Sequence, residues 1–331
     1  MTEPEDIPRA VDLLRAGRLV AFPTETVYGL GADASQPAAI AHLYRVKGRA
    51  ATHPVIVHCE SAETAFEWAA EVPGAARQLA ATFWPGPLTL VLKRSAHAGD
   101  YLTGGQDSVG LRVPAHPVAL ALLAAFRTAT AGRGRPAGLA APSANRSGRI
   151  SPTTALHVRI ELGEDVDCVL EGGASEVGIE STIVDLSRGR AVVLRPGHIP
   201  AEALAEALGE PVVLAGAEDE QAQADAPRAP GSHTRHYAPA TPAHLVAPHA
   251  LGAEIARYGA QAAVLAFSPP DERSDYWLRM PAEPEAYARK LYGALRELDE
   301  AACQVILIES PPDGAQWVAV RDRLRRATAE N

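Results

Sequence analysis

Residues 22–31 read FPTETVYGLG and follow directly on an apolar run at 19–21. The apolar run predicts a strand, and Pro23 and Gly29 are residue types that end strands and form turns. The two threonines then have two interpretations. Either they only satisfy the backbone of a turn, or the stretch is the lip of a pocket, because binding residues gather in loops that a rigid scaffold positions. Taken alone, the stretch favours the turn, since single short motifs are weak signals.

Strand-like and helix-like runs alternate on both sides of this stretch. Short apolar runs at 88–92, 109–113 and 182–186 predict strands, and helical spacing of apolar residues predicts helices at 118–126 and 201–208. Alternation of this kind indicates an α/β fold, in which helices cover a sheet.

The last third of the chain repeats the pattern on a smaller scale. Residues 217–232 are polar and rich in Ala and Pro, which is typical of a linker. Beyond them, strands and helices alternate in a Rossmann-like order, although the chain has no Gly-x-Gly-x-x-Gly turn. We therefore predict an N-terminal domain over 1–210, a linker and lid over 211–241, and a smaller Rossmann-like α/β domain over 242–331.

Composition excludes several classes of protein. The 331 residues carry a formal net charge of -9, and neither part has the basic excess of a protein that grips nucleic acid by its phosphates. No apolar run is long enough for a membrane span, and the acidic start MTEPEDIPRA lacks the apolar core of a signal peptide. Three widely separated cysteines indicate a reducing compartment. We expect a cytoplasmic protein with weak or no direct nucleic-acid binding.

Several catalytic motifs are missing from the sequence. It has no Gly-x-x-x-x-Gly-Lys-Ser/Thr, so no phosphate-binding P-loop is expected. It has no His-Glu-x-x-His and no Cys-x-x-Cys, which argues against zinc. It also has no Gly-x-Ser-x-Gly, so a nucleophile elbow is not supported.

Hydroxyls and cations instead follow several of the predicted strands. Each has a structural alternative, such as a charged helix end, a structural ion pair or a turn. Together they indicate a pocket for a carboxylate or phosphate at the strand ends. The candidates are Lys47, Arg49, His53, His58, Ser108, Arg112, Ser143, Asn145, Ser147, Ser181, Thr182 and Arg195.

Segments of the N-terminal part resemble the YrdC family over nearly all of residues 10–210. They occur in the family's order and read FPTETVYGLG, KGR followed by HPVIVH, GLRVPAH, APSANRSGRISPTTA, ESTIVD and LRPG. APGSHTRHYAPATP resembles the linker that precedes the extra domain of the long, two-domain threonylcarbamoyl-adenylate synthases. The resemblance implies a YrdC-like twisted mixed sheet with helices, followed by the smaller Rossmann-like domain.

The resemblance also implies an activity. It implies a nucleotidyltransferase, an L-threonylcarbamoyladenylate synthase that makes threonylcarbamoyl-AMP and pyrophosphate from L-threonine, bicarbonate and ATP. The product serves threonylcarbamoyladenosine modification of tRNA next to the anticodon, through a downstream tRNA threonylcarbamoyl transferase machinery. Mg²⁺ would come with ATP, held by phosphates and water rather than by a protein metal site. We expect a monomer.

The family's site residues carry over by their position in the motifs. Threonine is implied to meet Thr26, His58, Arg112, Ala141 and Ser181. ATP is implied to meet Arg49, His53, Ser108, Ser143, Asn145, Arg195 and Tyr237. Lys47 and Arg49 are implied to stabilise charge as the catalytic residues. His53 departs from the asparagine that is frequent at its position.

Tyr237 has two interpretations within the linker. The segment from Pro230 to Pro239 could fold across the N-terminal pocket, with Tyr237 covering the nucleotide and excluding water. Alternatively, Tyr237 packs on the first strand of the C-terminal domain.

Two other functions remain open on the sequence. One is a double-stranded-RNA-binding module without catalysis, which the acidic balance disfavours. The other is a carbamoyltransferase related to hydrogenase maturation, which would need acylphosphatase-like and zinc-finger segments that this chain lacks. Pyrophosphate release that requires both threonine and bicarbonate would discriminate between a synthase and the RNA-binding module.

Overall fold

The computed structural model describes residues 6–215, 226–231, 235–270 and 273–329, and the chain forms two compact units. Among the described residues, unit 1 holds 6–146, 152–176, 180–215 and 226–231, and unit 2 holds 147–151, 177–179, 235–270 and 273–329. Most of the predicted linker, 217–225, lies outside the described residues. Its described end, 226–231, belongs to unit 1.

Ten strands in the described part of unit 1 form one mixed sheet, in the order β10-β9-β8-β4-β5-β3-β6-β2-β1-β7. The strands are β1 (Val20–Phe22), β2 (Gly29–Asp33), β3 (Ile56–His58), β4 (Leu88–Lys93), β5 (Ser108–Arg112), β6 (Leu139–Ala140), β7 (Cys168–Val169), β8 (Thr182–Asp185), β9 (Val192–Arg195) and β10 (Val213–Leu214). The helices are α1 (Asp6–Arg15), α2 (Pro37–Lys47), α3 (Ala62–Phe66), α4 (Gly74–Phe83), α5 (Asp100–Thr103), α6 (Pro117–Thr130), α7 (Ala155–Leu162) and α8 (Ala201–Leu208). The α/β fold that the sequence predicts is thereby confirmed.

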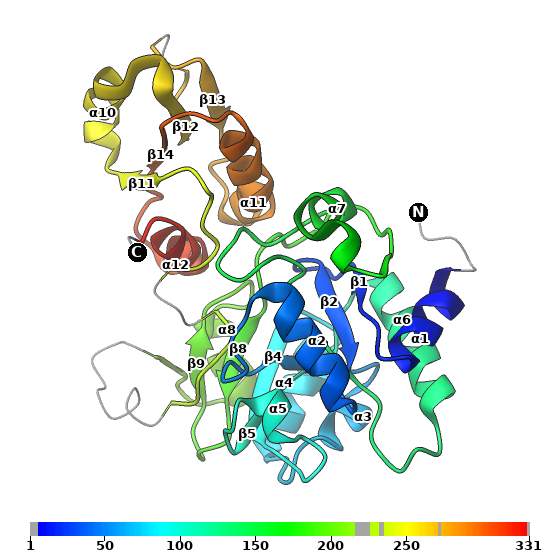
Figure 1. Ribbon diagram of the computed structural model, residues 1–331. Coiled ribbons are helices and arrows are strands. Elements are labelled where there is room, and N and C mark those ends of the chain that lie inside the picture. The colour runs from blue at the N-terminus through cyan, green and yellow to red at the C-terminus, as the bar shows by residue number, and fades with distance from the viewer. Residues whose placement is uncertain (1–5, 216–225, 232–234, 271–272, 330–331) are drawn as a thin grey trace. The chain divides into compact units, whose positions relative to one another are not determined.

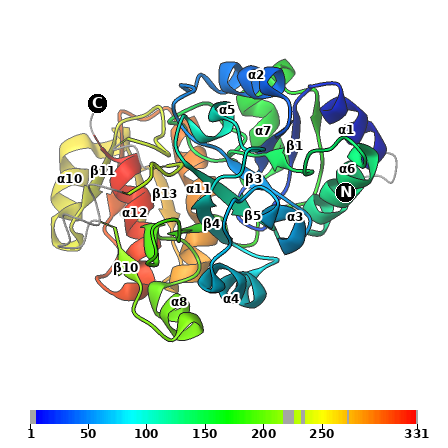
Figure 2. The same cartoon turned by 90° about the horizontal axis from the view of Figure 1, so that it is seen from below.

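Alternation of side chains along each strand divides the sheet residues between two faces. One face carries Val57, Leu90 and Leu111 and packs under helices that include α2, α4 and α5, which Figure 1 shows lying over β4 and β5. On the opposite face, Phe22 and Leu139 pack with α1 and α6. These two helices lie side by side in Figure 1 and Figure 2. Beyond them, the same face carries Ser108 and Arg112 on β5 and Thr89 on β4, together with the apolar side chains of Ile56, Val91 and Ile183.

The end of the opening stretch forms a strand, although Gly29 was expected to take part in a turn. Gly29–Asp33 is β2, which pairs antiparallel with β1. Gly31 is needed because this strand passes close to the Phe22 ring. A Cβ on Gly31 would lie 2.9 Å from the Phe22 ring atom Cε1, closer than such atoms approach. Thr24 and Thr26 therefore lie in the short connection between two paired strands.

The start of α7 differs from the sequence pattern. Ser151 and Pro152 look like a helix start, but Thr154 is the N-cap and accepts a hydrogen bond from the backbone N–H of His157. The reason is tertiary, because the Pro152 carbonyl accepts a hydrogen bond from the Tyr28 N–H at 2.9 Å and is held in an extended segment.

Unit 2 contains a small parallel sheet, as the Rossmann-like pattern predicts. Its four described strands lie in the order β11-β14-β12-β13. They are β11 (Ala243–Val246), β12 (Ala262–Ala266), β13 (Tyr276–Arg279) and β14 (Val305–Glu309), with helices α10 (Leu251–Tyr258), α11 (Pro284–Glu300) and α12 (Val318–Ala327). Across the residues that the structure describes in both units, no helix has the length and apolar character needed to cross a membrane.

Candidate active site

Predicted site residues from several strands share one face of the sheet in unit 1. Ser108 and Arg112 lie four positions apart on β5, so they point to the same face, and Arg112 pairs in register with His58 on β3. Arg195 on β9 bonds Ser181, next to β8, which continues the row. His58, Arg112 and Arg195 are the last residues of their strands, and Ser181 directly precedes β8, so these side chains lie at strand ends, as the sequence predicted.

Thr24 and Thr26 form a buried lip, and the donor and the acceptor of the hydrogen bond between their hydroxyls can be assigned. The Thr24 hydroxyl donates to the Val27 carbonyl at 2.6 Å and lies 2.9 Å from the Thr26 hydroxyl. Because Thr24 has used its single proton, Thr26 must donate in that second bond. The Thr26 oxygen therefore keeps its lone pairs as an acceptor for a substrate ammonium or hydroxyl.

Arg112 forms an ion pair with a residue that the sequence did not single out, Glu25. Its Nη2 lies 2.6 Å from Glu25 Oε1, and its Nε donates to the Gly86 carbonyl at 3.3 Å. The two side chains are only 5% and 9% exposed. The structural ion pair considered for Arg112 therefore exists. Glu25 stood within the quoted stretch, but no spacing in the sequence indicated its partner.

His58 is a neutral imidazole in this environment. Burial, with the nearby charge of Arg112 as a second cause, lowers its pKa to about 3. Its Nδ1 faces the Ile56 carbonyl at 3.3 Å, so Nδ1 carries the ring proton. Nε2 then keeps its lone pair and, like the Thr26 oxygen, can act as an acceptor.

Ala141 and Gly110 shape the floor around these groups. The Ala141 N–H donates to the Ile56 carbonyl at 3.0 Å, which fixes the backbone of Ala141 beside β3. Gly110 lies between Ser108 and Arg112 on β5, where a Cβ would lie 3.3 Å from Ile56 and 3.6 Å from Thr89. Because glycine has no side chain, no atoms of Gly110 project from the sheet between Ser108 and Arg112.

Ser181 and Arg195 connect the sheet face to the strap, which we define as residues 226–231. The Ser181 hydroxyl lies 2.8 Å from that of Thr89, a buried residue that the sequence did not suggest. Arg195 donates from Nη2 to the Ser181 hydroxyl at 3.2 Å and from Nη1 to the Pro230 carbonyl at 3.0 Å. Pro230, the first residue of the segment predicted to fold across the pocket, is thus bonded to Arg195, which the resemblance assigns to the nucleotide.

The strap is also held by an apolar contact and an amide pair. Ala229 is 7% exposed and packs with Ile56 and other apolar residues of the site face. The Gln106 side chain accepts from the Arg228 N–H at 2.6 Å and donates to the Arg228 carbonyl at 3.1 Å. These contacts lie within unit 1 and fasten the strap over the face that carries the candidate site.

Lys47, at the end of α2, lies beneath the loop that contains Ser143 and Asn145. Its ammonium donates to the carbonyls of both residues at 2.5 Å each. Burial, followed by the nearby charge of Arg49, lowers its pKa well below the usual value. Lys47 therefore shapes this loop as well as placing a charge beside it.

Arg49, His53 and Ser108 lie around the entrance to β3 and β5. The Arg49 Nη2 donates to the Pro54 carbonyl at 2.8 Å, and the Tyr44 hydroxyl donates to the His53 carbonyl at 2.6 Å. Ser108 begins β5 and is buried. These three residues, which the resemblance assigns to the nucleotide, therefore lie in one region of unit 1.

Tyr237 lies inside unit 2. Its ring stacks on Tyr292 of α11 with centroids 5.7 Å apart, and the Arg323 guanidinium of α12 lies 5.3 Å above it. It is 1% exposed and takes the left-handed backbone conformation, with φ of 62°. It packs on helices of this unit, and its predicted contact with the nucleotide stays a prediction.

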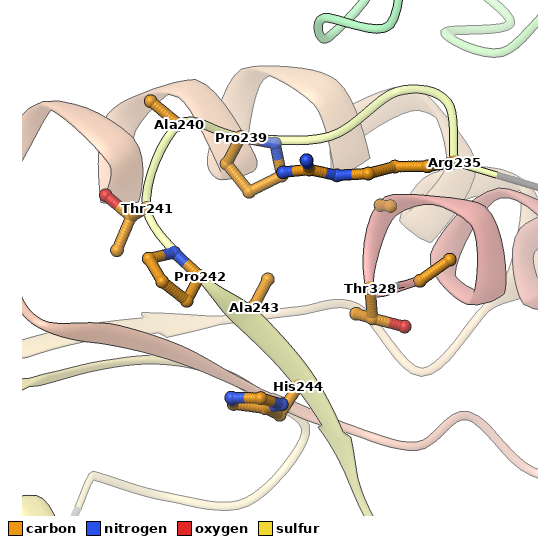
Figure 3. A pocket seen from close by; sticks show the side chains of 10 residues that line it. Arg235, Pro239, Ala240, Thr241, Pro242, Ala243, His244 and Thr328 are labelled. Atoms are coloured by element: carbon orange, nitrogen blue, oxygen red, sulfur yellow. The ribbon is translucent and has the colours of Figure 1, made fainter. Parts of the chain in front are cut away.

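Unit 2 has a pocket of its own. It measures about 300 Å³ and is lined by Arg235, residues 239–244 and the end of α12. Figure 3 shows the Arg235 side chain extending along one side and His244 on the strand below. Its lining is mostly proline and alanine, and none of the predicted site residues belongs to it.

Comparison with family models covers nearly the whole chain. A model described as "Telomere recombination" matches residues 12–197, and one described as "Threonylcarbamoyl-AMP synthase, C-terminal domain" matches residues 199–329.

Curated relatives match along their length. A threonylcarbamoyl-AMP synthase of Pyrococcus abyssi is 38% identical over 96% of this chain and 93% of its own. One of Bacillus subtilis is 35% identical over 98% of this chain and 94% of its own.

The fold agrees with solved structures. The crystal structure of P. abyssi Sua5 complexed with L-threonine superposes with a TM-score of 0.88 at 37% identity, covering 98% of this chain and 95% of that one. Escherichia coli YciO shares the fold of the first part at 23% identity and a TM-score of 0.52, covering 61% of this chain and 94% of its own.

Proposed function

Because this chain belongs to the family of YrdC-type threonylcarbamoyl-AMP synthases in their long, two-domain form, we propose that it makes threonylcarbamoyl-AMP from L-threonine, bicarbonate and ATP. The observation that carries the proposal is the polar sheet face, where a buried arginine lies in register with a neutral histidine. The relatives' names and the threonine complex of P. abyssi Sua5 support the same reaction.

The threonine half of the site offers one cation and several acceptors. Arg112 can bind the carboxylate through its guanidinium, whose fork matches a carboxylate. Thr26 Oγ1, His58 Nε2 and the Ala141 carbonyl can accept protons from the amine and hydroxyl of threonine. Ser181 completes this set at the neighbouring strand.

The reaction needs positioning more than a protein nucleophile. The amine nitrogen bonds to the carbon of bicarbonate and water leaves, which gives a carbamate. A carbamate oxygen then attacks the α-phosphorus in line, and the bond to pyrophosphate breaks. Lys47, Arg49 and Arg195 can neutralise the negative charge that the phosphates bring. Ser108, His53, Ser143 and Asn145 would hold the rest of the nucleotide.

Mg²⁺ would enter with ATP and reduce the charge repulsion between the phosphates and the carbamate. Its coordination by phosphate oxygens and water is part of the proposal. The Glu25 carboxylate, which lies beside Arg112, is not assigned to the metal, because Arg112 and the Ala115 N–H already bind its two oxygens. In the described residues, no group of three or more His, Cys, Asp or Glu side chains is arranged to hold a metal ion.

The wider context follows from the same proposal. The adenylate would pass to a tRNA threonylcarbamoyl transferase machinery, and the enzyme would work as a cytoplasmic monomer with weak or no direct nucleic-acid binding. All three cysteines are free thiols, which fits a reducing compartment. The strap would cover the nucleotide during the reaction, and Tyr237 stays among the residues that the resemblance assigns to the nucleotide.

Pyrophosphate release tests the proposal. The purified chain should release pyrophosphate from ATP only when both threonine and bicarbonate are present. Arg112→Ala should lose most of this activity, mainly through weaker threonine binding, because a buried carboxylate would lose its partner. Release that ignores threonine would contradict the proposal. Tight binding to double-stranded RNA without release would favour the rival RNA-binding function.

A further inference from the structure

Glu25 uses both of its carboxylate oxygens to hold the end of β5. Oε1 accepts from Arg112 Nη2 at 2.6 Å, and Oε2 accepts from the Ala115 backbone N–H at 3.0 Å. The ion pair is buried, with side chains 5% and 9% exposed. Burying a pair of charges gives little net stability, because the loss of hydration offsets the attraction. The arrangement therefore calls for a reason other than stability.

The contacts of Arg112 fix the plane of its guanidinium. Nε donates to the Gly86 carbonyl, and one N–H of Nη2 donates to Glu25. A rigid planar group held at two of its nitrogens keeps its remaining donors, those of Nη1 and the second of Nη2, at fixed angles within that plane. Those donors are the ones that a substrate carboxylate would use.

Glu25 also lies between Thr24 and Thr26 in the chain. Its bond to the Ala115 N–H fastens the threonine lip to the end of β5. Thr26 offers an acceptor for the amine, and Arg112 offers donors for the carboxylate. In an α-amino acid these two groups are separated by a single carbon, so the two halves of the site must keep a fixed spacing.

We propose that Glu25 is a positioning residue, which aims the Arg112 guanidinium and sets its spacing from Thr26 for binding an α-amino acid. The inference rests on the proposed function, because it deepens the threonine half of that site. Glu25 acts through Arg112 and the lip, and it does not touch the reacting atoms.

The test uses the full chain and the isosteric substitution Glu25→Gln. Glutamine has only one acceptor oxygen, and its amide N–H would face either Arg112 or the Ala115 N–H, so one contact is lost. Threonine titrated by calorimetry should bind about 10- to 100-fold more weakly. The KM for threonine should rise in parallel, while the KM for ATP stays within about threefold of the wild-type value.

Asp33→Asn is the matched control. Asp33 is also buried and also accepts from an arginine and a backbone N–H, with Arg133 at 3.1 Å and the Ser35 N–H at 2.9 Å. Asp33 is the last residue of β2, at the opposite end of that strand from the loop that contains Glu25. This variant should lose stability and keep the wild-type affinity for threonine.

A double-mutant cycle separates positioning from a general structural role. In an Arg112→Ala background, Glu25→Gln should weaken threonine binding by less than about twofold, because its effect passes through Arg112. Glu25→Asp keeps the negative charge, but its shorter side chain reaches only one of the two partners, Arg112 or the Ala115 N–H. The threonine affinity of this variant should therefore lie between those of the wild type and Glu25→Gln. It carries the test if Glu25→Gln does not fold.

Three results would overturn the inference. The first is wild-type threonine affinity in folded Glu25→Gln and Glu25→Asp, and this would leave the proposed function intact. The second is an equal loss of affinity from Glu25→Gln with and without Arg112. The third is a wild-type protein that binds no threonine, which would overturn the proposed function as well.

Discussion

Replacing Lys47 with methionine separates its charge from its shape. The ammonium is buried and donates to the carbonyls of Ser143 and Asn145 at 2.5 Å each. Methionine has a similar length and no charge, so Lys47→Met removes both bonds and the positive charge while it keeps most of the packing. Two quantities should change, namely the stability of unit 1 and the rate of adenylate formation.

The expected loss of stability is modest. Each hydrogen bond from a charged group contributes about 1.5–3 kcal/mol, so the two bonds set an upper limit of roughly 3–6 kcal/mol. Burial penalises the ammonium, as its lowered pKa records, and methionine removes that penalty. We expect a net loss of about 1–3 kcal/mol, because two carbonyls lose their donor.

The expected loss of activity is larger. A preorganised charge beside the phosphates is worth about 10²- to 10³-fold in rate, or roughly 2.7–4 kcal/mol. Pyrophosphate release should therefore fall by at least about 100-fold in kcat/KM for ATP, while threonine affinity measured by calorimetry changes little. Urea unfolding of the same preparations would give the change in stability.

Lys93→Met is the control for this experiment. Lys93 pairs with Glu71 at 3.2 Å on the surface, where its side chain is 49% exposed, so this variant should keep full activity. A folded Lys47→Met enzyme with kcat/KM for ATP within about threefold of the wild type would refute the role assigned to the charge.

Three further outcomes are expected. Serine, which lacks only the methyl group of threonine, should react with a kcat/KM about 10- to 200-fold lower, and valine should be far poorer because it lacks the hydroxyl; equal turnover of valine would rule out the threonine assignment. A chain that ends at Gly231 keeps the strap and should bind ATP more tightly than one that ends at Leu214, whereas full activity of the shorter chain and of Tyr237→Ala would show that the segment is only a tether. Since the pKa of His58 is lowered to about 3, the unfolded chain binds its proton below about pH 6.5 and the folded chain does not. The free energy of unfolding should therefore fall by about 1.4 kcal/mol per pH unit as the pH decreases from 6.5 towards 3, and His58→Gln should remove that contribution in urea unfolding at pH 7 and pH 5; an equal pH dependence in the variant would contradict the neutral histidine.

Much of the fold could be read from local patterns. The apolar runs at 88–92 and 182–186 became β4 and β8, and the helix expected at 201–208 is α8 with those bounds. Strand periodicity also determines which residues share a face, since side chains alternate regardless of what the strand pairs with. The motifs carried further information, because segments in a fixed order indicate a family even when each is weak alone.

The tertiary structure decided what local patterns do not encode. Glu25 and Arg112 are separated by 87 positions, and no period relates them, so their ion pair follows only from how β5 meets the first hairpin. Helix α7 begins later than the sequence pattern indicates, because the Pro152 carbonyl accepts a hydrogen bond from the Tyr28 N–H. Tyr237 had two possible surroundings in the sequence, and its ring stacks with Tyr292 because burial of an aromatic ring is decided by the helices that surround it. Periodicity is a property of a segment, whereas contacts between distant segments depend on the whole chain.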